Sequence, residues 1–300
     1  MRLMTLAPCQ AFPAEGCHCS DRWPARESPD APAPADVAVK QDERAPFARA
    51  LHRARVAAYP PGEFVDQESF MGAGEILALA RHAGIAPRIS VLDLCCGVAG
   101  PGRFITRELG CTYLGVDLSA SAIEIARERA GDLPCRFEVA RIPPVPDGSF
   151  EVVLLFETML AFPEKEPLLR EISGALTTGG RFVFTIEEGL PLTEGERARM
   201  PDADTVWLTS LPDVLACLDR VGLLVRWQDD CSRSHRAMVD SLIDSLAAET
   251  ANIAAQIGRR ALDELLAAHR LWSEWLREGR VRKLVFVAEK TGPRAIAGSL

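Results

Sequence analysis

Residues 91–102 read VLDLCCGVAGPG, and this stretch decides the fold. An apolar segment that contains the acid Asp93 leads into a turn of small residues, and a helix is predicted to begin at Pro101. Gly97 and Gly100 carry no Cβ, which would let the backbone approach a ligand closely. The start of the helix would offer unpaired N–H groups and a positive dipole to a carboxylate or a phosphate. The stretch therefore predicts a strand, a ligand-binding turn and a helix.

Asp117 follows Gly97 by twenty residues, at the end of a second predicted strand over residues 112–116. A carboxylate at that place can accept two hydrogen bonds from the hydroxyls of a ribose. The turn and the acid together indicate a cofactor that contains a nucleoside, bound at the carboxyl ends of the strands. The alternative is structural: an acid at the start of the helix that Ser119 opens, and a tight turn that holds no ligand.

Predicted strands and helices alternate along the chain. Repeated units of an apolar strand and a helix indicate a mostly parallel sheet with helices on both faces, which is a doubly wound α/β fold. The helix after the fourth strand is predicted to stop at Gly179 and Gly180. The predicted strands cover about seven stretches: 89–94, 112–116, 135–139, 151–156, 181–186, 223–227 and 282–288.

The segments outside the alternating pattern have their own character. Residues 1–45 are rich in Pro and Ala and are predicted to be a disordered leader, although Cys9, Cys17 and Cys19 could instead hold a metal. Residues 233–278 form a helical stretch, too long for a hairpin loop, with apolar positions at helical spacing. We expect this stretch to be a cap over the carboxyl edge of the sheet. The alternative is a dimer interface.

The composition excludes several classes of function. The chain has 300 residues, 48% of them hydrophobic, and a net charge of −8, so a nucleic-acid partner is disfavoured. No apolar run approaches the roughly 18–20 residues that span a bilayer, so no membrane partner is expected. The adjacent pair Cys95 and Cys96 in an apolar run suggests buried thiols in a reducing compartment, which predicts a cytoplasmic protein without a bound metal.

Four motifs resemble those of the class I S-adenosylmethionine-dependent methyltransferases. They are the loop 93–100, the segment 115–119 (GVDLS), the segment 147–153 (DGSFEVV) and the segment 178–182 (TGGRF). The resemblance covers about 64–290 and is strongest to the small-molecule branch, which includes quinone, sarcosine and natural-product methyltransferases. It implies a Rossmann-like, seven-stranded sheet with an antiparallel last strand, here with a helical lid before that strand. It divides the chain into the leader, N-terminal helices and a cofactor lid at 46–88, the methyltransferase domain at 89–290, and a tail at 291–300.

The resemblance also implies which residues hold S-adenosylmethionine. The first loop contacts the methionine part, and the acid that matches Asp117 holds the ribose. Cys95 and Ala99 stand where the family has the first and third loop glycines, and Arg141 lies in the stretch where the family usually has an acid near the adenine. The predicted cofactor residues are Asp93, Cys95, Gly97, Gly100, Asp117, Leu118, Arg141 and Glu157, with Phe64 and Gln67 as lid contacts.

Methyl transfer requires alignment of the acceptor in a dry pocket, and a base only where the acceptor carries a proton. The candidate catalytic residues are Glu157, after the fourth strand, Glu187, after the fifth, and His235, at the mouth of the cap. The alternative for these residues is a solvated loop acid or an exposed histidine. Trp207, Trp272 and Trp275 could line a pocket, although core packing is the expectation for the last two.

The sequence thus predicts an enzyme that transfers a methyl group from S-adenosylmethionine to a small-molecule acceptor, and a homodimer is possible. One alternative is a cofactor-binding regulator or partner subunit that performs no catalysis. Another is an NAD(P)-dependent oxidoreductase, which Cys95 disfavours because it occupies the first glycine position of the dinucleotide-binding turn. The acceptor could be an amine, a phenol or a carbocationic intermediate.

Overall fold

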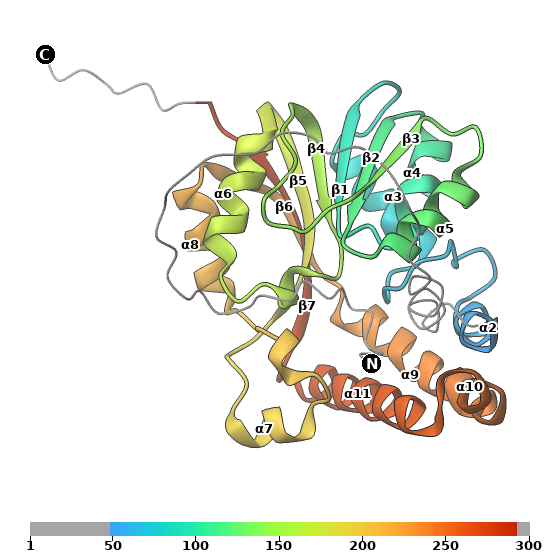
Figure 1. Ribbon diagram of the computed structural model, residues 1–300. Helices are drawn as coiled ribbons and strands as arrows, with labels where there is room; N and C mark the ends of the chain where they lie inside the picture. The colour runs from blue at the N-terminus through green and yellow to red at the C-terminus, as the bar shows by residue number, and fades with distance from the viewer. Residues whose placement is uncertain (1–48, 293–300) are drawn as a thin grey trace, which may run out of the picture.

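The computed structural model describes residues 49–292, and their core is one mixed sheet (Figure 1). Its strand order is β3-β2-β1-β4-β5-β7-β6, with β1 to β5 paired in parallel and β7 antiparallel to both of its neighbours. The predicted seven-stranded, mostly parallel sheet is therefore confirmed. The strands are β1 Ser90–Leu94, β2 Thr112–Asp117, β3 Cys135–Val139, β4 Phe150–Leu155, β5 Leu176–Glu188, β6 Leu223–Asp230 and β7 Arg282–Lys290.

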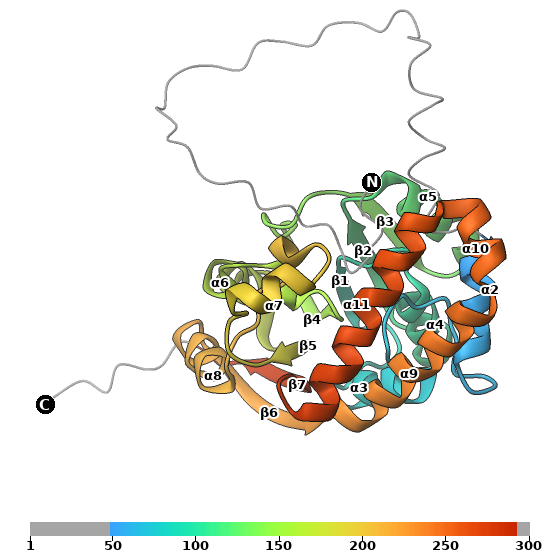
Figure 2. The ribbon, with the colours of Figure 1, turned by 90° about the horizontal axis from the view of Figure 1, so that it is seen from below.

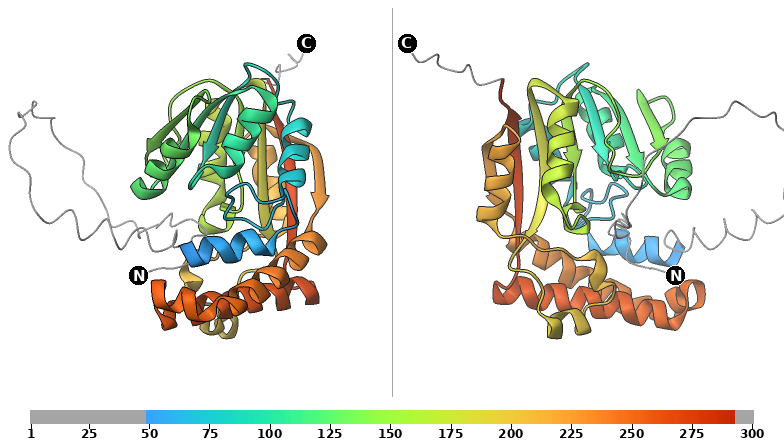
Figure 3. Two further views of the ribbon diagram at one scale, coloured as in Figure 1. Left: turned by 90° about the vertical axis from the view of Figure 1, so that its right-hand side faces the viewer. Right: turned by 60° about the vertical axis from the view of Figure 1, so that its left-hand side comes forward.

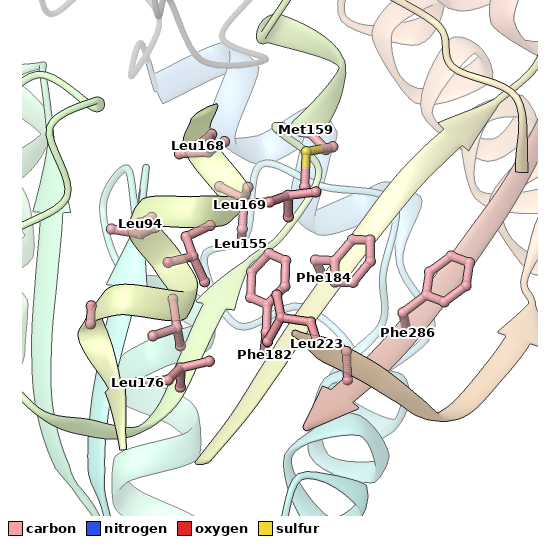
Figure 4. Close-up of a cluster of buried hydrophobic side chains, with 14 of the residues drawn as sticks. Leu94, Leu155, Met159, Leu168, Leu169, Leu176, Phe182, Phe184, Leu223 and Phe286 are labelled. Atoms are coloured by element: carbon pink, nitrogen blue, oxygen red, sulfur yellow. The ribbon is translucent and has the colours of Figure 1, made fainter. Parts of the chain in front are cut away.

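Helices cover both faces of the sheet, because the strands are apolar on both sides. On one face, α3 (Ala73–His82), α4 (Gly100–Leu109) and α5 (Ala120–Ala130) bury Ile76, Ile105 and Ile123 against the strands. On the other face, α6 (Lys165–Ala175) and α8 (Leu211–Arg220) bury Leu168, Leu169 and Leu218. Figure 4 shows this second layer, in which the stacked rings of Phe182, Phe184 and Phe286 run across β5 and β7.

The helix that was predicted to stop at Gly179 and Gly180 ends earlier. Helix α6 ends at Ala175, and β5 begins at once with Leu176, which pairs with Phe150. The register then shifts, so that Val152 pairs with Arg181. Gly179 has a φ of +78° inside this irregularity, so it provides a bulge at the start of β5 instead of a helix stop.

Four further helices form a separate layer beyond the carboxyl edge of the parallel strands (Figures 2 and 3). The stretch predicted as a cap forms α9 (Ser232–Ala248), α10 (Thr250–Ile257) and α11 (Arg259–Glu278). The N-terminal helix α2 (Arg49–Ala58) packs on α9 and α10. We call these four helices the roof.

The roof has its own apolar core. Leu51 of α2, Leu246 of α9, Ile253 of α10 and Leu262 of α11 are buried together. Two hydrogen bonds join α2 to the other helices: the Ala50 N–H donates to Gln256 Oε1 at 2.9 Å, and Ser241 Oγ donates to the Ala58 carbonyl at 2.7 Å. The amphipathic faces of 233–278 are therefore covered within the chain.

Short elements that the sequence reading did not predict lie between β4 and α8. They are the 3₁₀ turns η2 (Met159–Ala161) and η3 (Ala203–Thr205) and the helix α7 (Glu194–Arg199), which a capping box of Thr193 and Glu196 opens. None of the helices within 49–292 has the length and apolar character that a bilayer crossing demands. The predicted leader, with Cys9, Cys17 and Cys19, lies outside the described residues, as does most of the tail at 291–300.

Candidate functional site

The loop between β1 and α4 has an unusual backbone. Cys95, Gly97 and Ala99 all adopt left-handed conformations, with φ between 54° and 57°. Residues other than glycine seldom adopt this conformation, and such strain gathers at functional sites. A Cβ added at Gly97 would meet no heavy atom within 4 Å, so the space beside this residue is open. The loop therefore presents a strained, open turn at the carboxyl end of β1.

Asp117 ties this loop to the end of β2. Its carboxylate accepts the Gly97 N–H and the Ser119 N–H, each at 2.8 Å. Burial raises the pKa of Asp117, while the two backbone hydrogen bonds act in the opposite direction. Ser119, not Asp117, caps α5, because its side chain accepts the Ala122 N–H. The carboxylate therefore lies beside the open turn and is hydrogen-bonded to it.

Asp93 lies beneath the same turn and faces the neighbouring strand. The Tyr113 hydroxyl donates a 2.6 Å hydrogen bond to its carboxylate. Burial raises the pKa of Asp93 to about 7, and the charge of Asp117 acts in the same direction. The Tyr113 ring can lie beside Asp93 because Gly102 has no side chain. A Cβ on Gly102 would lie 2.1 Å from this ring.

The predicted lid segment packs against the turn, and Gln67 is hydrogen-bonded within this segment. The Gln67 amide donates to the carbonyls of Glu63 and Met71 at 2.8 Å, and its oxygen accepts the Val65 N–H. Gln67 is thus bonded to the backbone of its own loop. A Cβ on Gly100 would lie 2.2 Å from the Val65 carbonyl oxygen, so this glycine makes room for the lid.

The remaining residues predicted to line the site are spread more widely. Phe64 packs its ring against His52 of α2 and against Tyr59, which directly follows α2. Cys95 and Leu118 are half-buried at the ends of β1 and β2, and Arg141 is exposed just after β3. Trp207 is 37% exposed and stacks against the Arg197 guanidinium, so it lines no buried pocket. Trp272 and Trp275 are buried in the core, as expected.

The three predicted catalytic residues meet at the carboxyl edge of β4 and β5, under the roof. Glu157 has a φ of +59° and donates its N–H to Thr185 Oγ1 at 2.7 Å. His235, on the first turn of α9, has its Nδ1 4.0 Å from Glu157 Oε1. Lys283 of β7 lies between the acids, with its Nζ 2.7 Å from Glu157 Oε1 and in contact with Glu187. We call Glu157, Glu187, His235 and Lys283 the buried polar cluster.

Burial dominates the electrostatics of this cluster, because all four side chains are shielded from solvent. Burial raises the pKa of Glu187, which Lys283 opposes, and it lowers the pKa of His235 well below its usual range, which Lys283 reinforces. Burial also acts to lower the pKa of Lys283, but the two carboxylates outweigh it and the net shift is upward. At neutral pH the cluster therefore combines a charged lysine with a neutral imidazole.

Several polar atoms of this region lack a hydrogen-bond partner among the described residues. They are the second carboxylate oxygens (Oε2) of Glu157 and Glu187, both ring nitrogens of His235 and the Thr158 hydroxyl. Buried polar groups in proteins are nearly always paired, so each exception calls for an explanation. A polar ligand bound at the cluster would supply these partners.

The sequence reading did not predict Lys283. It stands beside Arg282 at the start of a strand, a pattern that resembles a solvated strand end. The antiparallel register places Lys283 directly opposite Glu187. The pairing could be inferred only once β5 and β7 were known to be neighbours.

The comparisons with known proteins agree with this geometry. A family model described as "Methyltransferase domain" matches residues 92–184. The chain is 28% identical to Methyltransferase GfsG of Streptomyces halstedii over 42% of this chain and 48% of the relative. It is 32% identical to the sarcosine/dimethylglycine N-methyltransferase of Halorhodospira halochloris over 36% of this chain and 40% of the relative. The matched stretches thus span less than half of either curated relative.

The fold is also similar to that of a solved structure. The phosphoethanolamine N-methyltransferase 2 of Haemonchus contortus, in complex with phosphomonomethylethanolamine and S-adenosylhomocysteine, superposes with a TM-score of 0.70. The alignment covers 84% of this chain and 59% of that one at 18% sequence identity. At this identity the likeness concerns the fold alone.

Proposed function

We propose that this chain, which belongs to the class I S-adenosylmethionine-dependent methyltransferases, transfers a methyl group from S-adenosylmethionine to a small-molecule acceptor. The observation that carries the proposal is the hydrogen-bonded position of Asp117 beside the open Gly97 turn.

The residues around the turn fit the cofactor. The Asp117 carboxylate can accept both ribose hydroxyls, and the space beside Gly97 leaves room for the backbone to touch the methionine part. Cys95 and Leu118 would border that space, with Arg141 on the adenine side. Asp93 would support the turn from below through Tyr113. When bound, the cofactor supplies a methyl group that its sulfonium charge has already activated.

The lid contributes indirectly in this proposal. Gln67 holds the lid backbone in shape, and Gly100 lets the lid lie against α4. Phe64 connects the lid to the roof through its contact with His52 of α2. These three residues therefore position the lid, and the lid excludes water from the reacting groups.

The buried polar cluster is our candidate for the acceptor side. Glu157 lies at the end of β4, the strand next to β1, so the cluster is beside the cofactor turn at the same edge of the sheet. Glu157, Glu187 and His235 would bind and orient the acceptor, and the roof would keep the site dry. The roof would also select the acceptor by shape.

Two further expectations belong to this proposal. Burial raises the pKa of the Cys96 thiol well above its usual range, which keeps it protonated and suits a structural thiol in the cytoplasm. A homodimer, if it forms, would use a surface other than the apolar faces of the roof helices, because those faces pack within the chain.

Calorimetric titration of the full-length protein with S-adenosylmethionine tests the function. Asp117→Ala should weaken binding at least about tenfold, because each charge-assisted hydrogen bond contributes roughly 1.5–3 kcal/mol. Asp132→Asn, an exposed acid after α5, is the matched control and should bind as the wild type does. Unchanged affinity in Asp117→Ala would contradict the assignment.

A further inference from the structure

The lid, which joins α2 to α3, carries two acids that pair with different parts of the molecule. The Asp66 carboxylate lies 2.8 Å from the guanidinium of Arg103 in α4 and 3.2 Å from that of Arg129 in α5, so it is tied to helices that pack on the sheet. Two positions further on, the Glu68 carboxylate lies 2.9 Å from the guanidinium of Arg55 in α2, so it is tied to the roof. The lid therefore connects the roof to the sheet layer.

The residue between the two acids makes them one unit. Gln67 is only 1% exposed, and its amide donates to the carbonyls of Glu63 and Met71 at 2.8 Å. These hydrogen bonds close this part of the lid into a compact turn. A displacement of Asp66 therefore also displaces Glu68.

Asp66 is held in an unfavourable backbone conformation. Its φ is +63°, a left-handed value that residues other than glycine adopt at a cost. Its carbonyl oxygen lies against the first turn of α4, where a Cβ on Gly100 would be 2.5 Å from it. The side chains of Arg103 and Asp66 are 13% and 26% exposed, so solvent screens their ion pair only in part. Loss of the ion pairs would let the backbone of the lid relax away from α4.

The Arg55–Glu68 pair lies between the cofactor turn and the roof. Burial raises the pKa of Asp117, and the charge of Glu68 acts in the same direction, which places Glu68 near the acid at the open Gly97 turn. Burial lowers the pKa of His269 in α11 to about 4, and the charge of Arg55 acts in the same direction, which places Arg55 near the core of the roof. The pair thus links the two regions.

On these observations, and resting on the function proposed above, we propose that the lid is a latched gate for the cofactor and that Arg55 and Glu68 couple this gate to the roof. The gate opens when the Asp66 carboxylate leaves Arg103 and Arg129. Because this part of the lid moves as one unit, its opening also displaces α2 through Glu68 and loosens the roof. Cofactor exchange and roof opening are then one motion, and a bound cofactor stabilises the roof.

The exchange kinetics of S-adenosylhomocysteine, measured by surface plasmon resonance on the full-length protein, test the gate. Asp66→Asn should raise the association and dissociation rate constants together, each at least about fivefold, and leave Kd nearly unchanged, because the closed lid is weakened equally in the free and the bound protein. Glu108→Gln removes an exposed ion pair with Arg107 on α4. It is the matched control and should leave both rate constants unchanged.

Salt provides a test that needs no variant. S-adenosylhomocysteine is a zwitterion without net charge at neutral pH, so salt has little effect on its encounter with the protein. Raising the ionic strength from about 0.05 M to about 0.5 M should therefore raise both rate constants of the wild type by screening the ion pairs of Asp66. Asp66→Asn should show little of this dependence.

Hydrogen exchange followed by mass spectrometry tests the coupling to the roof. Binding of S-adenosylhomocysteine should slow exchange in α2 of the wild type. Arg55→Gln should abolish this slowing while S-adenosylhomocysteine still binds, because the ion pair with Glu68 is lost. Arg53→Gln is the matched control on the same helix, since it removes an ion pair with Glu249, between α9 and α10, and should retain the slowing.

Each other outcome would overturn the inference. Unchanged rate constants in Asp66→Asn, or wild-type rate constants that do not respond to salt, would mean that the ion pairs do not hold the lid. Faster dissociation with unchanged association would mean a weakened site without a gate. Exchange in α2 that ignores S-adenosylhomocysteine, or that still slows in Arg55→Gln, would mean that the roof is not coupled.

These failures are distinct from a failure of the proposed function. A protein that binds S-adenosylhomocysteine and gives one of these results keeps its proposed function and loses only the latched gate. A protein that does not bind S-adenosylhomocysteine loses the proposed function itself.

Discussion

Gly100 and Val65 lie so close together that a Cβ on the glycine would be 2.2 Å from the valine carbonyl oxygen. The contact joins the first turn of α4 to the lid. Two ion pairs support it, because Asp66 contacts Arg103 at 2.8 Å and Arg129 at 3.2 Å. The second glycine of the turn therefore serves the packing of the lid, while Gly97 borders open space.

Gly100→Ala should destabilise the protein and displace the lid. The added methyl group meets backbone atoms that cannot rotate away, and such overpacking costs typically about 1–3 kcal/mol. Gly97→Ala is the matched comparison, since only its positive φ opposes the methyl group, at a cost of about 1 kcal/mol. Urea denaturation of both variants measures the difference. Equal stabilities, or the larger loss in Gly97→Ala, would show that the lid does not pack as described.

Asp93 should make the stability of the cofactor-free protein depend on pH. Its pKa rises from 3.8 to about 7 on folding, so the folded state binds the proton more tightly than the unfolded state. Stability is then highest below the unfolded pKa and falls as pH increases towards 7. The loss reaches about 4 kcal/mol at most, on the basis of about 1.4 kcal/mol for each pKa unit.

Asp93→Asn tests this because it keeps the shape and removes the charge. The free energy of unfolding would be measured by urea denaturation from about pH 4.5 to about pH 8. The stability of the variant relative to the wild type should increase up to about pH 7, and above that pH the difference should stay constant. Tyr113→Phe removes the hydrogen bond that favours the ionised form, so its stability should decline more steeply over the same range. Parallel curves for Asp93→Asn and wild type would mean that Asp93 is not held as a buried acid.

The sequence predicted the fold well because the signals were local. The apolar strands and the turn at Gly97 alternate with amphipathic helices, and each of these patterns depends on residues close together in the chain. The helix end predicted at Gly179 was wrong for the same reason. A Gly-Gly pair after a helix resembles a stop signal, whereas the bulge that Gly179 forms in β5 depends on the register of β5 against β4.

The candidate site was only partly predictable. Glu157 and Glu187 could be selected because each follows a predicted strand, and His235 because it lies at the mouth of the predicted cap. Lys283 could not be selected, because its partners are 96 and 126 positions away and meet it only through the antiparallel pairing of β7. Gln67 was predicted to contact the cofactor because it lies in the predicted lid, whereas the hydrogen bonds of its amide to its own loop depend on the folded backbone.

Lys283→Met should be strongly destabilising. It leaves two buried carboxylates without their cation, and breaking a buried ion pair from one side costs about 3–5 kcal/mol. Adding Glu187→Gln to Lys283→Met should recover part of the loss, because one of the two unpaired charges is then removed. Thermal denaturation of the single and double variants gives the coupling between the residues.

The neighbouring residue supplies a control for that experiment. Arg282 is 44% exposed and pairs with Glu188 at 2.9 Å on the surface, so Arg282→Met should change stability by no more than about 1 kcal/mol. A similar loss for both methionine variants would point to general damage to β7. Additive losses in the double variant would show that Lys283 and Glu187 do not interact.

The roof should be held together by contacts within one chain. Leu51 of α2 is buried against α9, α10 and α11, so Leu51→Ala should cost about 2–5 kcal/mol and speed hydrogen exchange in α9. Val56, on the same helix, is 45% exposed, so Val56→Ala should leave exchange in α9 unchanged. Hydrogen exchange followed by mass spectrometry would report both results.

Dilution separates the roof from a dimer interface. If the protection of α9 to α11 comes from α2 and from one another, it should be the same at every protein concentration, because the contacts are intramolecular. A dimer interface would lose protection as the protein dissociates on dilution. A roof over the reaction site should also exchange more slowly once S-adenosylhomocysteine is bound, because the filled site resists opening. Protection that falls on dilution and does not change when S-adenosylhomocysteine binds would assign these helices to an interface between two chains.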